Sequence, residues 1–283
     1  MKLASAPIDV SPPRVALPWG RWGLRVTAAL YLGVMIALPL AAIIANGLRD
    51  GLRAFWSDLA SPAAFAALKL TILMAIIVTL INAVMGTLTA YVIVRYRFYG
   101  RGLLNGLIDM PFAIPTLVTG VMLVALYGPS SVLGTILGQY GIGVVYRQPG
   151  IVLALLFVTL PFVVRLVEPA LREMDREPEH AAATLGASPR TIFFSVTLPA
   201  IRPAVSAGAL LSFARAIGEF GAIVIIAGNL PHKTQTAAIY VLGEIESENQ
   251  RGASAMSVAM LATAFALTAL VDRVQGEPRG RAR

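Results

Sequence analysis

Six long runs of apolar residues follow one another along the chain, and nearly all of its charged residues lie in the short segments between them. The runs cover residues 26–45, 70–94, 110–127, 148–164, 203–228 and 254–271. A bilayer core of about 30 Å takes roughly 20 mostly apolar residues as a helix, so each run is close to the required length. The pattern predicts an all-α integral membrane protein with six transmembrane helices.

Composition supports a membrane protein and removes several other classes. Of the residues, 57% are hydrophobic and 13% are charged, whereas soluble domains carry about 25% charged residues. The net charge of +8 lies in the connections rather than on a basic face, so we expect no nucleic-acid partner. The chain has no cysteine, and its two histidines, His180 and His232, lie far apart. We therefore expect neither disulfides nor a metal site.

The connections predict the orientation. With the N-terminus inside, 16 Lys and Arg residues of the tails and connections fall on the cytoplasmic side and 6 on the outer side, as the positive-inside rule requires. We expect both termini to be cytoplasmic, with tails at 1–25 and 273–283 around a transmembrane domain at 26–272. The polar, proline-broken N-terminus is expected to be a retained tail rather than a signal peptide.

One cytoplasmic connection, "HAAATLGASPRTIFFSVTLP" at residues 180–199, has an unusual pattern of small residues, glycine and proline. Pro178 suits a first helical position, and Glu179 then lies in the first turn, where the helix dipole favours a carboxylate. Gly186 suits a left-handed helix end. Ser188 and Pro189 predict the start of a second helix, which should end before the proline at 199.

The first of these two helices presents a narrow face of small residues. Ala181, Ala182 and Leu185 lie along it, and such a face can enter a groove on another protein. The alternative is a connector that lies on the membrane surface. That alternative would normally show a broader apolar face flanked by Lys and Arg, so we favour a protein partner.

The same stretch resembles the cytoplasmic loop of binding-protein-dependent ABC importer permeases. That loop carries Glu-Ala-Ala, three residues, Gly, nine residues and then Ile-x-Leu-Pro. The matching residues here are Ala181, Ala182, Gly186, Val196, Leu198 and Pro199. The chain departs from the pattern at the acid, where it has His180, with Glu179 one residue earlier. Whether Glu179 or His180 makes the contact of the family's acid stays open.

The resemblance implies a fold and a set of partners. The fold is that of a type I ABC importer permease, with a core at about 65–272 and a coupling loop at 168–202 that docks on a cytoplasmic ATPase. The implied partners are a second, homologous permease, two ATPase subunits that bind ATP and Mg²⁺, and an external binding protein. The chain contains no G-x-x-x-x-G-K-[ST] phosphate loop, in agreement with a separate ATPase subunit.

Longer segments narrow the resemblance to sulfate/thiosulfate importer permeases of the inner membrane, and to the T-type member of their permease pair. These segments are "YRFYGRGLLNGLIDMPFAIPTLVTGV", "LPFVVRLVEPALREMDRE" and "SFARAIGEFGAIVIIAGNLPHKTQT". Molybdate/tungstate importer permeases share parts of the third segment and form the alternative. The long connection at 128–147 favours the sulfate type. A membrane enzyme would need a catalytic constellation, and the apolar runs lack one.

Two charged residues, Arg215 and Glu219, lie inside the fifth apolar run. Four residues apart on a helix, they share a face and can pair. One role for the pair is structural, holding the helix against its neighbours. The alternative is a place in the anion pathway, where Arg215 would bind the anion transiently and Glu219 would weaken that binding. A secondary transporter could use the same pair for ion coupling without any ATPase.

Overall fold

The computed structural model describes residues 18–275, and all regular secondary structure in that range is helical. The predicted tails at 1–25 and 273–283 lie largely outside the described residues. The chain divides into two units, residues 1–45 and 46–283, and each is described here by itself.

The first unit carries one apolar helix with a π turn in it. Helix α1 (Pro18–Leu32) continues through η1 (Gly33–Ala37) into α2 (Leu38–Gly47). Leu38 N–H donates to the Gly33 carbonyl, five residues back. The next residue is Pro39, which has no N–H to give to the ladder, so the π turn absorbs the irregularity without ending the helix. The first predicted run, 26–45, lies inside this helix.

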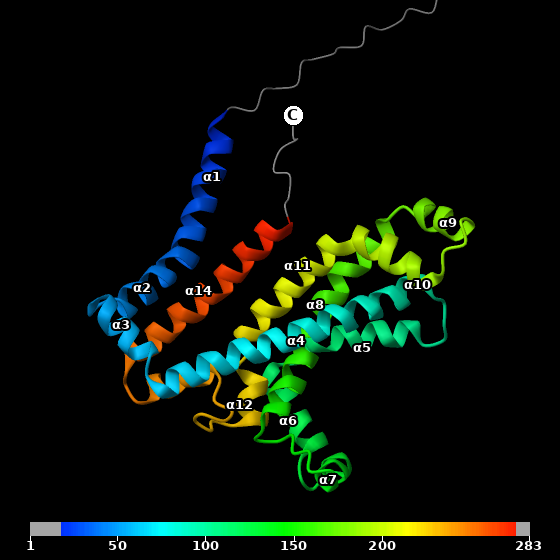
Figure 1. Cartoon of the computed structure of the whole chain (residues 1–283). Coiled ribbons are helices and arrows are strands. Elements are labelled where there is room, and N and C mark those ends of the chain that lie inside the picture. The colour runs from blue at the N-terminus through cyan, green and yellow to red at the C-terminus, as the bar shows by residue number, and fades with distance from the viewer. Residues whose placement is uncertain (1–17, 276–283) are drawn as a thin grey trace, which may run out of the picture. The chain divides into compact units, whose positions relative to one another are not determined.

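Three long helices form the centre of the second unit. They are α4 (Pro62–Arg95), α8 (Gln148–Glu173) and α11 (Leu198–Ile217), and each packs on the other two (Figure 1). Val78, Leu155 and Phe213, one from each helix, belong to a single buried apolar cluster. The close approach of α11 to α8 requires Gly208, because a Cβ there would lie 2.9 Å from Val163 Cα. Small residues at helix contacts are typical of membrane proteins.

A second group of helices packs around the sixth predicted run. Helix α14 (Gln250–Gln275) contains residues 254–271 and packs on α3 (Gly51–Leu59) and α13 (Ala237–Glu246). Phe55, Ala237 and Met256 are buried in this cluster. Arg251 Nε donates to Asp58 Oδ2 at 2.8 Å and so ties the start of α14 to α3.

The third predicted span, 110–127, is wrong as a single helix. The chain instead forms α5 (Arg101–Ala113) and α6 (Thr116–Tyr127), which meet at 117°. Ile114, with φ −88° and ψ 126°, is extended, as expected for a residue that precedes a proline. Gly120 of α6 and Ala222 of the short helix α12 (Gly221–Ala227) lie against each other. This contact, one of many between α6 and α12, holds α6 in its bent direction.

The fourth and fifth predicted spans also have different ends. Helix α8 continues nine residues beyond Val164, because the charges that follow are paired with one another. The predicted span 203–228 is not one helix: α11 ends at Ile217 and α12 begins at Gly221. Within residues 18–275, five helices are long and apolar enough to cross a bilayer, and the bent α5–α6 pair makes six if it counts as one span.

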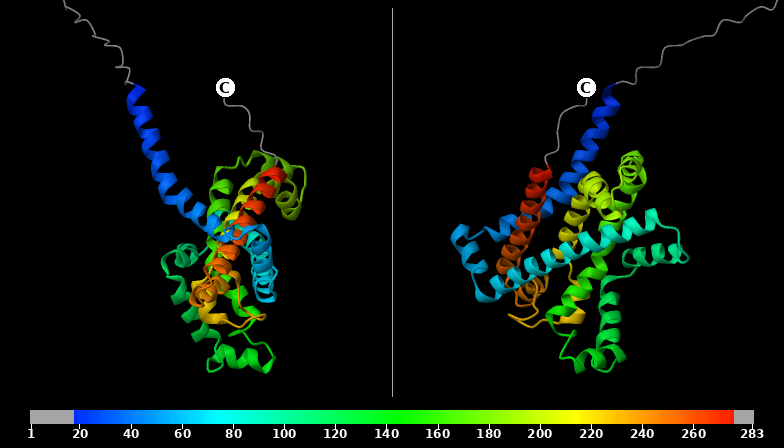
Figure 2. Two further views of the ribbon diagram at one scale, coloured as in Figure 1. Left: turned by 90° about the vertical axis from the view of Figure 1, so that its left-hand side faces the viewer. Right: turned by 45° about the vertical axis from the view of Figure 1, so that its right-hand side comes forward.

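The two ends of α8 carry different structures. Helices α9 (Glu177–Thr184) and α10 (Pro189–Ile192) lie at its C-terminal end, whereas α6, α7 (Val132–Gln139) and α12 lie at its N-terminal end (Figures 1 and 2). The small-residue stretch is therefore separated from the α6–α12 end by the length of a membrane-spanning helix.

Candidate functional site

Helix α9 ends in the left-handed turn that the sequence predicts. Gly186 has φ +84°. Its N–H donates to the Ala183 carbonyl at 3.0 Å, and Ala187 N–H donates to the Ala182 carbonyl at 3.0 Å. These two bonds form a Schellman motif. A Cβ on Gly186 would meet nothing within 4 Å, so conformation rather than space requires the glycine.

The second helix begins as predicted but does not end where predicted. The Ser188 side chain accepts a hydrogen bond from Thr191 N–H at 3.2 Å, and Pro189 is the first residue of α10. The expectation that this helix ends before Pro199 is wrong. It continues through η2 (Phe193–Thr197) into α11, and Leu198 N–H donates to the Phe193 carbonyl. As at Pro39, a π turn directly precedes a Leu-Pro pair and keeps the helix continuous.

Glu179 faces the interior of its own chain. Its Oε1 lies 2.9 Å from Arg95 Nη2, at the end of α4, and accepts a hydrogen bond from Thr197 Oγ1 at 2.6 Å. The side chains of Arg95 and Glu179 are 9% and 11% exposed. The carboxylate thus ties α9 to both α4 and η2. His180, the neighbouring residue, is exposed.

The predicted small-residue face is only partly outward. Ala181 and Leu185 are exposed, and the Leu185 residue is 88% exposed, whereas Ala182 is half-buried. Val196 and Leu198 are also half-buried, and Leu198 packs on the cluster around α4 and α8. Pro199 is exposed. Among the predicted coupling residues, His180, Ala181 and Leu185 therefore form the outward part of α9 and its end.

Arg215 and Glu219 pair, although they do not share a helix. Arg215 Nη2 lies 2.7 Å from Glu219 Oε2, and the Glu219 side chain is 1% exposed. Because α11 ends at Ile217, Glu219 lies in the link to α12 and not on the α11 face that the spacing predicts. Glu219 Oε1 also accepts a hydrogen bond from Ala222 N–H at 2.8 Å. The carboxylate therefore holds the first turn of α12 on the end of α11.

A second charged cluster, between α5 and α8, was not predicted. Arg165 Nε and Nη2 each donate to a carboxylate oxygen of Asp109 at 2.7 Å, and Nη1 donates to Glu168 at 2.5 Å. Arg172 Nη2 donates to the other oxygen of Glu168 at 2.6 Å. Asp109 and Arg165 each lie one residue outside a predicted span. The spacing of Arg165, Glu168 and Arg172 along one helix face was the available signal.

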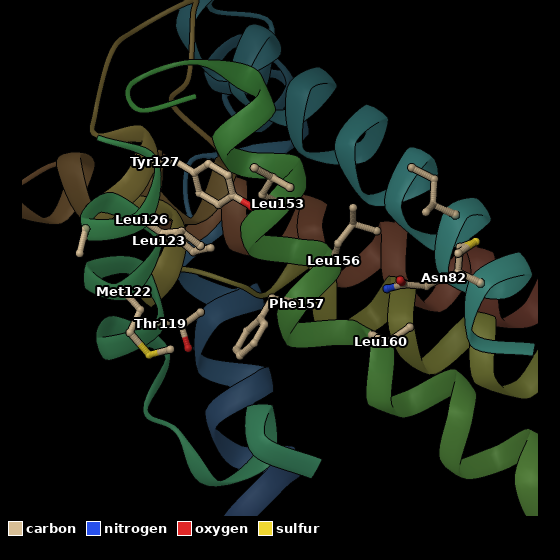
Figure 3. A pocket seen from close by; sticks show the side chains of 13 residues that line it. Asn82, Thr119, Met122, Leu123, Leu126, Tyr127, Leu153, Leu156, Phe157 and Leu160 are labelled. Carbon is tan, nitrogen blue, oxygen red and sulfur yellow. The ribbon is translucent and has the colours of Figure 1, made fainter. Parts of the chain in front are cut away.

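A cavity of about 820 Å³ opens between α4, α6 and α8 (Figure 3). Of its 13 lining residues, all within the described part of the chain, only Asn82, Thr119 and Tyr127 carry polar side chains. Asn82 Nδ2 already donates to Thr159 Oγ1 at 2.7 Å. Apolar walls do not compensate a desolvated anion, so this cavity is a poor oxyanion site.

Comparison with known proteins decides the family. A family model described as "Binding-protein-dependent transport system inner membrane component" matches residues 82–276. The chain belongs to this family. As an inner membrane component it is a multi-pass membrane protein, in agreement with the long apolar helices.

Individual relatives and a solved structure agree. This inner membrane component is 38% identical to the sulfate transport system permease protein CysT of Salmonella typhimurium, over 88% of this chain and 90% of the relative. It is 37% identical to the probable sulfate transport system permease protein cysT of Nephroselmis olivacea, over 91% and 90% of the two chains. A chain of the bacterial alginate ABC transporter, solved with an alginate pentasaccharide-bound periplasmic protein, is 15% identical with a TM-score of 0.77, covering 92% and 94%. The predicted type I ABC permease fold is confirmed.

Proposed function

We propose that this chain is the membrane-spanning permease subunit of an ATP-driven importer for sulfate and thiosulfate. The observation that carries the proposal is the similarity to sulfate permeases over nearly the whole chain, at 38% identity over 88% of its residues for the Salmonella relative. The family match at residues 82–276 spans both charged clusters and the corner formed by α9, the turn at Gly186 and α10 (the α9 corner), so it is not confined to a few apolar helices.

The coupling function of the α9 corner is part of the proposal. A cytoplasmic ATPase subunit, present in two copies, binds ATP and Mg²⁺ and docks on the outward residues His180, Ala181 and Leu185. Support comes from the Schellman motif at Gly186, which fixes the helix end, and from the exposure of Leu185. The sequence has no phosphate loop of its own, so the chain itself is a transport subunit without ATPase activity.

The remaining partners follow from the same proposal. A second, homologous permease completes the pathway, and an external binding protein delivers the anion at the α6–α12 end. The α9 end and both termini are cytoplasmic, an orientation supported by the excess of Lys and Arg in the α4–α5 and α8–α11 connections.

Reconstitution of the complete complex tests the proposal. Proteoliposomes that hold this chain, the second permease, the ATPase and the binding protein should take up radiolabelled sulfate only with ATP and Mg²⁺. Thiosulfate should compete with the labelled sulfate, whereas molybdate and tungstate should compete weakly. Uptake driven by an ion gradient without ATP would contradict the proposal, and preferential competition by molybdate would overturn the substrate.

A further inference from the structure

The guanidinium of Arg165 is held by Asp109 in a two-pronged contact within the membrane-spanning part of the chain. Arg165 Nε lies 2.7 Å from Asp109 Oδ1, and Nη2 lies 2.7 Å from Oδ2. A guanidinium presents the same fork to a carboxylate and to a tetrahedral oxyanion, because both offer two oxygens at a matching spacing. The carboxylate of Asp109 thus occupies a site that two oxygens of sulfate would fit.

The cluster lies deep in the two helices. Asp109 is eight residues from the start of α5 at Arg101, and Arg165 is eight residues from the end of α8 at Glu173. At 1.5 Å per residue, both are about 12 Å inside their helix ends. Their side chains are nevertheless 52% and 29% exposed. Charged side chains within membrane-spanning helices usually face protein or a water-filled path rather than lipid.

The two carboxylates that contact Arg165 are held differently. Glu168 is bonded from both sides, by Arg165 and by Arg172, and its side chain is 11% exposed. Among the described residues Asp109 is bonded by Arg165 alone, and half of its side chain is exposed. Asp109 is therefore the carboxylate that can leave the guanidinium, while Glu168 keeps Arg165 in position.

The pair at Arg215 lacks this freedom. Glu219 is 1% exposed and bonds both Arg215 and the Ala222 N–H, so its departure would release the first turn of α12. Asp109 can therefore leave Arg165 at lower cost than Glu219 can leave Arg215.

We propose that Arg165 is an anion-binding residue on the cytoplasmic half of the pathway, and that the passing oxyanion displaces Asp109 from its guanidinium. The inference rests on the proposed anion transport. When the anion leaves, Asp109 returns to Arg165, so binding remains escapable, as conduction requires. The exchange also keeps Arg165 neutralised when no anion is present.

The absence of cysteine from this chain allows a direct test by thiol accessibility in the assembled complex. Gly106 lies three residues before Asp109 on the same face of α5, and a Cβ there would meet nothing within 4 Å. Leu107, which is exposed but lies on the opposite face, supplies the matched control. Each single-cysteine variant, Gly106→Cys and Leu107→Cys, is treated with a small, water-soluble, cationic methanethiosulfonate reagent. Modification is measured as the mass increase of this chain alone.

We expect Gly106→Cys to react and sulfate, but not chloride at equal ionic strength, to protect it. Leu107→Cys should show no sulfate protection. Adding Asp109→Asn to Gly106→Cys should lower the half-protecting sulfate concentration by about tenfold, because one charge-assisted hydrogen-bonding competitor is removed. Adding Arg165→Gln should remove the protection, and Arg165→Lys should weaken it, since the ammonium lacks the fork.

Three results would overturn the inference. An unreactive Gly106→Cys would mean that protein or lipid covers this face. Equal protection by sulfate and chloride would mean that no oxyanion site exists there, and an unchanged midpoint in Asp109→Asn would mean that Asp109 does not compete. None of these depends on the assembly of an Arg165 variant. Failure of the proposed function itself would instead appear as a lack of ATP-dependent sulfate uptake by the unmodified complex.

Discussion

Two of the arginine–glutamate pairs, Arg95–Glu179 at α9 and Arg215–Glu219 between α11 and α12, have nearly the same construction. Arg95 contacts Glu179 at 2.9 Å, and Arg215 contacts Glu219 at 2.7 Å. Each glutamate is largely buried and accepts one further hydrogen bond, from Thr197 Oγ1 in the first pair and from Ala222 N–H in the second. In both places the carboxylate fastens a short helix to the end of a long one.

The difference between the pairs lies in what surrounds the fastened helix. Glu179 ties α9 to α4 and η2, while His180 of the same helix and Leu185 at its end are exposed. Helix α12 is packed between α6 and α8, and five of its seven residues are buried. The contact at α9 therefore positions an exposed surface, whereas the one at α12 supports the core. Neither glutamate is free to contact a ligand.

The largest effect is expected from Arg215→Gln. It leaves the Glu219 carboxylate buried without its counter-ion, which costs about 3–5 kcal/mol in comparable cases. We expect poor assembly of the complex, measured as yield and thermal midpoint after detergent extraction. Glu219→Gln should assemble better, because its amide oxygen can still accept from Ala222 N–H. Normal assembly of both variants with lost sulfate uptake would instead make this pair part of the pathway.

Loss of the Arg95–Glu179 pair should impair transport more than assembly. Glu179→Gln removes a charge-assisted contact to Arg95 worth about 1.5–3 kcal/mol, but α9 contributes little to the core. We therefore expect the permease to assemble, while substrate-stimulated ATP hydrolysis and sulfate uptake fall together. A double-mutant cycle with Arg95→Gln should show that the second substitution adds little to the first. Full additivity of the two losses would contradict a direct functional pairing.

The position of the α9 surface can also be changed without touching either ion pair. Gly186→Val forces a β-branched residue into φ +84°, at a cost of about 1–3 kcal/mol. We expect intact membrane insertion, weaker co-purification of the ATPase and reduced uptake. Gly186→Asn is the matched control, because asparagine tolerates the left-handed region. Wild-type uptake by the valine variant would show that this helix end does not set the docking surface.

The apolar runs and the local signals predicted a large part of this structure. All six runs lie mostly on helices, with the third and fifth broken, and the left-handed Gly186 and the cap at Ser188 follow from residue chemistry alone. The errors came from tertiary contacts. Pro111 and Pro115 allow a kink in the third span, but the size of the 117° bend between α5 and α6 depends on the packing of α6 on α12. The predicted span ends at Val164, before the charge of Arg165, and is too short. In the structure Asp109 of α5 neutralises Arg165, so α8 continues.

Tertiary contacts, which the sequence pattern does not show, also explain what was missed at the candidate sites. Spacing predicted that Arg215 and Glu219 pair, but not that Glu219 caps α12 from outside the helix. The choice between Glu179 and His180 could not be made from the sequence, because it depends on Arg95, 84 residues away along the chain. Contacts between distant segments are what a pattern of apolar positions does not contain.

The smallest effect on stability is expected at His180. This residue stands where the family's loop pattern has its acid, so its substitution tests whether the α9 corner contacts the ATPase as that pattern implies. Its side chain is exposed, so His180→Ala should change stability by no more than about 0.5 kcal/mol. Because Glu179 faces Arg95, we expect His180 to occupy the position from which the family's acid reaches the ATPase. His180→Glu should then retain ATPase binding and uptake, while His180→Ala should weaken binding without affecting assembly of the two permeases. Binding is measured by co-purification of the ATPase at increasing salt, where a polar contact at the rim weakens first. If His180→Ala binds as wild type does at every salt concentration, the imidazole makes no contact, and docking depends on Ala181 and Leu185 alone.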